Sequence, residues 1–137
     1  YLRSYGKGAV GRIIDNGKLY LFTNGFGGAG FYASVSSNAS TLSDSANNSL
    51  SLNRWINVTV TRPSTGLTTI LYINGVASGA GGSSGTPEAG SNIYIGGTSG
   101  ASANFDGLIS GVRVISGILT AQEVSQLFSS ERKLYNA

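Results

Sequence analysis

Short apolar runs alternate with polar, glycine-rich stretches along most of the chain. Runs rich in Val, Ile, Leu, Phe and Tyr are typical of β-strands, and they lie at residues 10–15, 19–23, 31–35, 56–61, 70–73, 93–95 and 108–115. In the run 56–61, Ile and Val alternate with Asn and Thr, which indicates a strand with one solvated face. The run 70–73 is apolar on both faces and predicts a central strand. Many short strands at this spacing predict a β-sandwich or a barrel.

Turn and loop signals separate the predicted strands. Asn16-Gly17 and Asn74-Gly75 are hairpin turn signals, because both central residues of a type I′ turn need positive φ. The polar stretch 36–49 contains nothing to bury and predicts a long loop. The Gly- and Ser-rich stretch 78–91 predicts a flexible loop.

A helix is predicted only near the end of the chain. Thr120 and Glu123 form the T-x-x-E pattern of a capping box, and Leu119 and Val124 have the spacing of a hydrophobic staple. From there the apolar residues recur with helical spacing and would pack one face of a short helix onto the strands. The residues on that face are Val124, Leu127 and Phe128.

Composition restricts the class of protein. A chain of 137 residues with 40% hydrophobic residues is large enough for one domain with a buried core. It has no Cys, Met or His, so it forms no disulfides and lacks the usual zinc ligands and general bases. Few oxidisable side chains suit a location outside the cell.

Charge and hydropathy exclude two kinds of partner. The net charge is +3, but the nine basic residues are scattered, whereas a nucleic-acid surface needs a clustered basic stripe. Nucleic-acid binding is therefore not expected. No stretch has the length of a membrane span, so membrane insertion is not expected either. The first residue is Tyr1 rather than Met, as in a processed or trimmed protein.

Five blocks in the second half resemble the laminin-G-like, concanavalin A-like jelly-roll domains. They are RWINVTVT at 54–61, LYINGV at 71–76, IYIGG at 93–97, FDGLISGVRV at 105–114 and LTAQEV at 119–124. Their order makes the match specific over roughly residues 50 to 130. The resemblance implies an all-β, jelly-roll β-sandwich with one short C-terminal helix.

The chain departs from the family pattern at two places. Ser110 and Gly111 stand where family members often have an acidic pair, a form reminiscent of copies in phage structural proteins. The family also has one or two strands ahead of the point where this chain starts. Residues 1–137 are therefore expected to form a single domain that lacks one or two N-terminal strands. A strand from upstream or from a neighbouring subunit would then cover Val10, Ile13, Leu19 and Leu21.

Catalysis is not expected. Glucan-cleaving enzymes on this fold carry acids at alternate strand positions, and retaining glycosidases need two carboxylates about 5–5.5 Å apart. The six acids of this chain are dispersed at Asp15, Asp44, Glu88, Asp106, Glu123 and Glu131. Without His or Cys, a Ser triad or thiol chemistry is also excluded.

Candidate ligand-binding residues are Asn24, Phe26, Asn104 and Asp106. Many relatives bind calcium at the sandwich rim. A tight calcium site needs several carboxylates, and Asp106 is the only one among these candidates, so a role in turn hydrogen bonding is favoured for it over metal binding. No cofactor is expected, and Asp106 is the candidate ligand if calcium binds. Phe26 lies in a glycine-rich segment and either stacks on a ligand or covers the core. Strict alternation places Trp55 opposite Ile56, but the family packs this Trp inside through a bulge, so Trp55 is expected in the core.

The sequence favours a non-catalytic carbohydrate-binding or adhesion module of an extracellular surface or virion protein. The alternative is a structural subunit, such as a phage fibre, capsid decoration or surface filament, that assembles by strand pairing with its neighbours. The expected partners are accordingly a glycan or cell-surface polysaccharide and other protein subunits. The expected location is a virion or bacterial cell surface.

Overall fold

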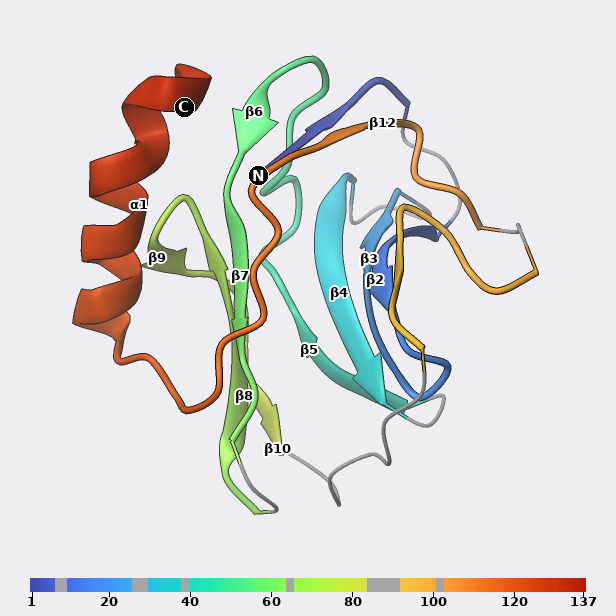
Figure 1. The fold of residues 1–137 in the computed structure, drawn as a ribbon. Helices are drawn as coiled ribbons and strands as arrows, with labels where there is room; N and C mark the ends of the chain where they lie inside the picture. The colour runs from blue at the N-terminus through green and yellow to red at the C-terminus, as the bar shows by residue number, and fades with distance from the viewer. Residues whose placement is uncertain (7–9, 26–29, 38–39, 64–65, 84–91, 101–102) are drawn as a thin grey trace.

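The structure, a computed structural model, is a sandwich of two β-layers with one helix packed outside it (Figure 1). It describes residues 1–6, 10–25, 30–37, 40–63, 66–83, 92–100 and 103–137. All strand pairs in its sheets are antiparallel. The all-β prediction with one C-terminal helix is confirmed.

The first layer is a five-stranded sheet. Its strands follow the order β11 (Tyr94–Ile95), β2 (Gly11–Asp15), β3 (Leu19–Asn24), β4 (Tyr32–Ser37) and β5 (Ser40–Asp44). The register of β2 on β3 shifts between Arg12 and Ile14. This bulge inserts one extra residue, so Ile13 and Ile14 both line the interior while Arg12 and Asp15 share the other face, where they form an ion pair.

The second layer consists of two short sheets joined along one stretch of chain. The first has the order β12 (Gly107–Ile109), β1 (Leu2–Ser4), β6 (Trp55–Ile56). The second has the order β10 (Gly82–Ser83), β8 (Thr68–Ile73), β7 (Val58–Thr61), with β9 (Val76–Ala77) also on β8. Only Asn57 separates β6 from β7, so the two sheets meet there. The prediction that 70–73 lies in a central strand is confirmed.

The core lies between the layers. Phe31, Ala33, Val35 and Leu42 come from β4, β5 and their connections, and they meet Leu50, Ile56 and Leu71. Partly buried Val58 and Val60 of β7 pack against this cluster. The prediction that Val58 and Val60 face the core is therefore confirmed. Thr59 is half-buried and Thr61 is buried, so the other face of this strand is not solvated as predicted.

The two Asn-Gly turns differ. At Asn74-Gly75 both residues have positive φ (51° and 78°), and the turn joins β8 to β9 through the Ile73–Val76 pair, so the type I′ turn is confirmed. At Asn16-Gly17 only Gly17 has positive φ, so the hairpin forms with a different turn. There the carboxylate of Asp15 accepts a hydrogen bond from the Gly17 amide (2.6 Å).

The predicted loops contain strands. The stretch 36–49 includes the end of β4 and all of β5, with Leu42 buried, so a loop over this range is wrong. Ser45 can be buried because its hydroxyl has partners: Ser45 Oγ accepts from the Ala33 amide (2.8 Å) and pairs with Ser49 Oγ (2.7 Å). In the stretch 78–91, Gly82–Ser83 form β10, and residues 84–91 lie outside the described part.

The predicted strand over 108–115 is shorter than expected. β12 ends at Ile109, and the chain beyond it pairs with no strand of the described residues. Val112 and Val114 are 38% and 75% exposed, and Gly111 has a φ of 60°. The apolar alternation of this segment is therefore not matched by burial.

The predicted helix is confirmed as α1 (Ala121–Tyr135). Thr120 is its N-cap, and the hydroxyl of Thr120 accepts from the Glu123 amide while the Glu123 carboxylate accepts from the Thr120 amide (2.7 Å). This bond, and then that from the Thr120 hydroxyl, lowers the pKa of Glu123 below its ordinary value. Val124 is fully buried, and Leu127 and Phe128 are half-buried.

We expect Thr120→Ala to lower the free energy of unfolding by about 1 kcal/mol, because the first turn loses its cap. Thermal or denaturant unfolding measures the loss. Ser125→Ala, at an exposed position of the same helix, is the control and should not destabilise the protein. Equal stability of Thr120→Ala and the parent would contradict the capping role.

Candidate functional site

Three of the candidate residues lie on two strand connections at the rim of the sandwich: Asn24 at the end of β3, and Asn104 and Asp106 between β11 and β12. Asn24 ends β3, and its amide nitrogen donates to the Tyr32 hydroxyl (3.0 Å). Asn104 is exposed and forms a bridge with Arg12 of β2, next to the Gly11–Thr23 pair. Phe26 lies outside the described residues. The structure thus places Asn24 and Asn104 near one end of the β2–β3 hairpin.

Asp106 lies on the segment that leads into β12. Its carbonyl accepts from the Tyr5 amide (2.9 Å) and from the Ser4 hydroxyl (3.4 Å), while its side chain is exposed. These main-chain bonds join Asp106 to the end of β1, and the turn role of its side chain stays a prediction. Among the residues that the structure describes, no three or more acidic, His or Cys side chains gather in a way that could hold a metal ion.

A polar cavity of about 600 Å³ lies on the opposite side of β1 and β6 from the core, beside the end of α1. We call it the Trp55 cavity. Arg3 of β1 and Trp55 of β6 are cross-strand partners on its wall. Its lining residues are Arg3, Ser49, Ser51, Asn53, Arg54, Trp55, Ile56, Asn74, Leu134, Tyr135, Asn136 and Ala137.

Trp55 is half-buried, so the expectation of a core residue is wrong. Its neighbour Ile56 faces the core, and successive side chains of a strand point to opposite faces, so Trp55 points away from it. The alternation that placed Trp55 opposite Ile56 was the correct signal, and the family's inward packing does not apply here. The Trp55 ring lies 5.4 Å from that of Tyr135, tilted by 58°.

The aromatic wall of the cavity continues into a row of rings that holds α1 on the sandwich. Tyr135 stacks on Tyr1 (3.9 Å between centroids), and Tyr1 in turn lies against Phe128 (6.4 Å). Burial and then the charge of Glu131 raise the pKa of the Tyr1 hydroxyl above its ordinary value. Tyr135 and Trp55 are thus fixed by packing rather than by a ligand.

Main-chain bonds fix the polar residues of the Trp55 cavity. The Asn53 amide donates to the Ser4 carbonyl (2.8 Å), with Asn53 in the left-handed region (φ 59°). The Asn74 side-chain oxygen accepts from the Asn57 amide (2.9 Å). Asn53 and Arg54 are exposed. The cavity therefore combines preset aromatic faces with hydrogen-bonding side chains, and sequence reasoning did not find it.

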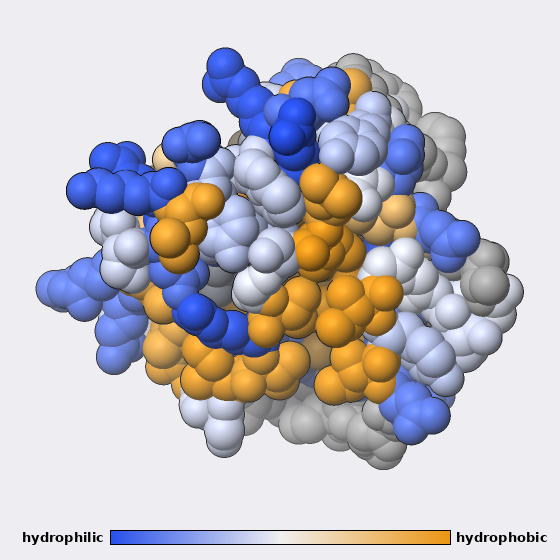
Figure 2. All heavy atoms as spheres, turned by 45° about the horizontal axis from the view of Figure 1, so that its top comes forward, coloured by the Kyte–Doolittle hydropathy of each residue, from blue (hydrophilic) through white to orange (hydrophobic). Residues whose placement is uncertain are grey.

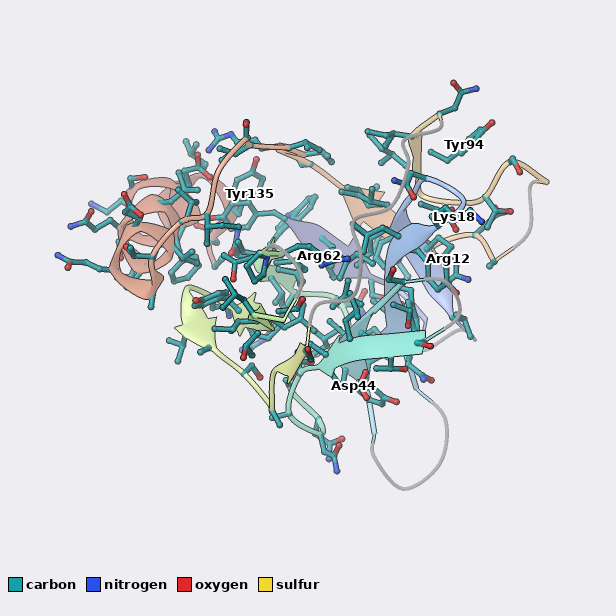
Figure 3. The ribbon with its side chains drawn as sticks, turned by 90° about the horizontal axis from the view of Figure 1, so that it is seen from below. Arg12, Lys18, Asp44, Arg62, Tyr94 and Tyr135 are labelled. Carbon is teal, nitrogen blue, oxygen red and sulfur yellow. The ribbon has the colours of Figure 1, made fainter. Side chains whose placement is uncertain are left out.

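A second arginine–aromatic cluster lies on β2 and β3. The Arg12 guanidinium is 3.9 Å from the Tyr20 ring centroid and 5.1 Å from that of Phe22, and its Nε is 3.2 Å from an Asp15 oxygen. Figure 3 shows Arg12 on the side of the molecule away from Tyr135. Its charge is already neutralised and stacked within the sheet, so this cluster serves stability first.

No helix within the described ranges is long and apolar enough to cross a membrane.

A comparison with family models matches residues 3–125 to the concanavalin A-like lectin/glucanases superfamily, as a laminin-G-type domain. No curated protein matches the chain, and no solved structure does. The match covers most of the chain, and the antiparallel sheets with one C-terminal helix agree with the jelly-roll sandwich of that family. The chain therefore belongs to the concanavalin A-like lectin/glucanase superfamily.

Proposed function

We propose that this protein is a non-catalytic, extracellular carbohydrate-binding or adhesion module, and that it holds its glycan in the Trp55 cavity. The observation that carries the proposal is the cavity itself, in which a half-exposed indole and a phenol ring stand among amide, hydroxyl and guanidinium groups. A virion or bacterial surface is the proposed setting.

The chemistry of a sugar suits this lining. A sugar ring has an apolar face of C–H groups, which an aromatic ring can cover, and a rim of hydroxyls that need hydrogen-bond partners. Trp55 and Tyr135 supply rings with a polar end. Asn53 and Arg54 supply exposed donors, and Asn53 an acceptor as well. A volume of about 600 Å³ lies in the ordinary range of small-ligand sites.

The acids of the described residues favour binding without hydrolysis. No acidic residue lines the Trp55 cavity. Three acids have structural partners: Asp15 pairs with Arg12, Glu123 caps α1, and Glu131 pairs with Arg113. Asp44 and Asp106 are on different elements, whereas a retaining mechanism needs two carboxylates about 5–5.5 Å apart.

The rim residues Asn24, Asn104 and Asp106 provide the alternative position for a ligand. Asn104 and Asp106 are exposed, so they can reach a glycan. Exposed Tyr5 is an aromatic neighbour of Asp106, to whose carbonyl its amide donates, but the paired rings of Trp55 and Tyr135 line the Trp55 cavity. We therefore propose the Trp55 cavity as the principal site. An experiment has to distinguish binding in this cavity from binding at the rim.

Trp55 is the single Trp of the chain, so its fluorescence reports on this cavity alone. We expect a glycan identified on an array to change the emission in a saturable way, because a sugar over the indole displaces water from it. Asn53→Ala should weaken the response, whereas Asn104→Ala, at the rim, should leave it unchanged. No reducing ends should appear during the same incubation.

Two results would contradict this proposal. A glycan that binds by calorimetry without changing the Trp55 emission, and whose binding Asn104→Ala weakens, would move the site to the rim. A chain that binds no glycan and self-associates by particle sizing would favour the structural-subunit function instead.

A further inference from the structure

The turn between β2 and β3 holds an Asn-Gly dipeptide among hydrogen-bonding partners. Asn16 and Gly17 follow Asp15, the last residue of β2. Asp15 Oδ1 accepts from the Gly17 amide (2.6 Å). Asn16 Oδ1 accepts from the amides of Lys18 (3.0 Å) and Leu19 (2.7 Å). The turn therefore places a carboxylate on the Gly17 nitrogen and two N–H donors on the side-chain carbonyl of Asn16.

An Asn-Gly sequence can react within its own chain. The main-chain nitrogen of the glycine attacks the side-chain carbonyl carbon of the asparagine, and glycine has no Cβ to hinder the approach. The attack needs a base that takes the N–H proton and donors that stabilise the negative charge on the carbonyl oxygen. The contacts of the β2–β3 turn supply both.

Asp15 has the position of the base. A general base must lie within hydrogen-bond reach of the proton that it removes, and Asp15 Oδ1 is already bonded to the Gly17 N–H. The other oxygen, Oδ2, lies 3.2 Å from Arg12 Nε, which orients the carboxylate. Asp15 is also buried, so its side chain is held against the nucleophile.

The amides of Lys18 and Leu19 have the positions of an oxyanion hole. When the side-chain carbonyl carbon of Asn16 is attacked, negative charge develops on Oδ1, the atom to which both amides already donate. Backbone donors that are in place before the reaction stabilise such a charge without having to reorganise. The hydrogen bonds of the folded turn thus favour the reaction, whereas an unfolded chain would have to form them.

Water reaches the turn. Gly17 and Lys18 are exposed, and Asn16 is half-buried. On the face of the molecule that Figure 2 shows, hydrophobic residues gather in a continuous patch. Residues 16–18, by contrast, present only polar side chains and main chain, so no apolar side chain of the turn itself covers the Asn16 carbonyl. A cyclic product formed there is therefore open to hydrolysis.

We propose that the β2–β3 turn is a self-modification site, at which Asn16 becomes aspartate or isoaspartate through a succinimide, with Asp15 as the general base. The Gly17 nitrogen forms a bond to Asn16 Cγ, its proton passes to Asp15 Oδ1, and the carbonyl electron pair moves onto Asn16 Oδ1. The carbonyl then re-forms, the bond from Cγ to the side-chain nitrogen breaks, and that nitrogen leaves as ammonia with the proton returned by Asp15. Water opens the ring at either carbonyl and leaves one new carboxylate.

Asn74-Gly75 is a matched control within the same chain. The dipeptide is identical, and Asn74 Oδ1 also accepts from a main-chain amide, that of Asn57 (2.9 Å). Gly75, however, is buried against Phe128 of α1, and no acidic side chain of the described residues accepts from its amide. The two sites therefore share their intrinsic chemistry and differ in the base and in the access of water.

The test follows both asparagines in the folded 137-residue chain at neutral pH. Peptide mass spectrometry after digestion measures the replacement of ammonia by water at each site, and ion-exchange chromatography follows the fall in the net charge of +3. We expect Asn16 to react about tenfold or more faster than Asn74. Asn16 should also react faster in the folded chain than in urea, where the two sites should react equally.

Asp15→Asn removes the base and keeps a side-chain oxygen that can accept from the Gly17 amide. We expect it to slow the reaction of Asn16 by about tenfold or more in the folded chain and to leave the rate in urea unchanged. Thermal unfolding in parallel shows whether the variant is folded. Equal rates at Asn16 in the folded parent and in folded Asp15→Asn would overturn the proposal. So would a parent chain in which Asn16 reacts no faster when folded than in urea, a comparison that does not depend on the variant.

Discussion

Replacing Leu71 by alanine is expected to lower the free energy of unfolding by about 3 kcal/mol. Leu71 lies in the central strand β8 with none of its surface exposed, and it contacts the core from the second layer. Truncation removes buried methyl groups and leaves a cavity between the sheets. A domain has a total stability of only about 5–15 kcal/mol, so the loss is a large fraction. Denaturant unfolding at neutral pH measures it.

Leu67→Ala is the matched control for this prediction. The substitution is chemically identical, but Leu67 precedes β8 and is 58% exposed. Its effect should stay within about 0.5 kcal/mol, as for surface positions generally. If both variants lost the same stability, the burial of Leu71 in the core would be contradicted.

Local patterns predicted those parts of the fold that depend on neighbouring residues. The Asn74-Gly75 turn formed as predicted because two adjacent residues with positive φ suffice to fix a tight hairpin. The Thr120–Glu123 capping box formed because its partners lie within one turn of helix. The same dipeptide at Asn16-Gly17 forms a different turn, in which only Gly17 has positive φ, so the local signal predicts the hairpin but not its turn type.

Features that depend on distant partners were predicted less well. β5 contains mostly polar residues, and it becomes a strand through its pairing with β4, which buries Leu42 and Ser43. The segment 110–115 has the opposite property, because its alternation is that of a strand but the described residues offer it no partner. A sequence pattern records the preference of a segment for pairing, and not whether a partner is present.

The candidate site shows the same division. The sequence predicts Asn24, Asn104 and Asp106 as polar residues of the rim. The structure places Asn24 at the end of β3 and Asp106 directly before β12, and Asn104 forms a bridge with Arg12. The Trp55 cavity joins residues of β1, β6 and the end of α1, which are far apart in the sequence. Alternation alone could have shown that Trp55 points away from Ile56. The position of Tyr135 beside it could not be inferred, because it depends on how α1 packs.

Replacing Trp55 by alanine is expected to weaken glycan binding by about tenfold or more, since it removes the larger of the two rings in the cavity. The variant should nevertheless stay folded. Trp55 is half-buried, so its truncation should cost less than the roughly 3–5 kcal/mol of a fully buried Trp. Trp55→Phe should retain most of the affinity, because it keeps an aromatic face while losing the indole N–H. Calorimetric titration measures binding, and thermal unfolding in parallel measures stability.

Tyr94→Ala provides the control for ring truncation. Tyr94 is also half-buried, but it lies on β11 at the far side of the molecule from Tyr135 (Figure 3). It should lose stability without losing affinity, because its ring is remote from the cavity. Unchanged affinity of Trp55→Ala would exclude the Trp55 cavity as the glycan site. A third result is that Trp55→Ala unfolds at the growth temperature while Trp55→Phe folds but does not bind. The aromatic face alone would then be insufficient, and the indole N–H would make the decisive contact.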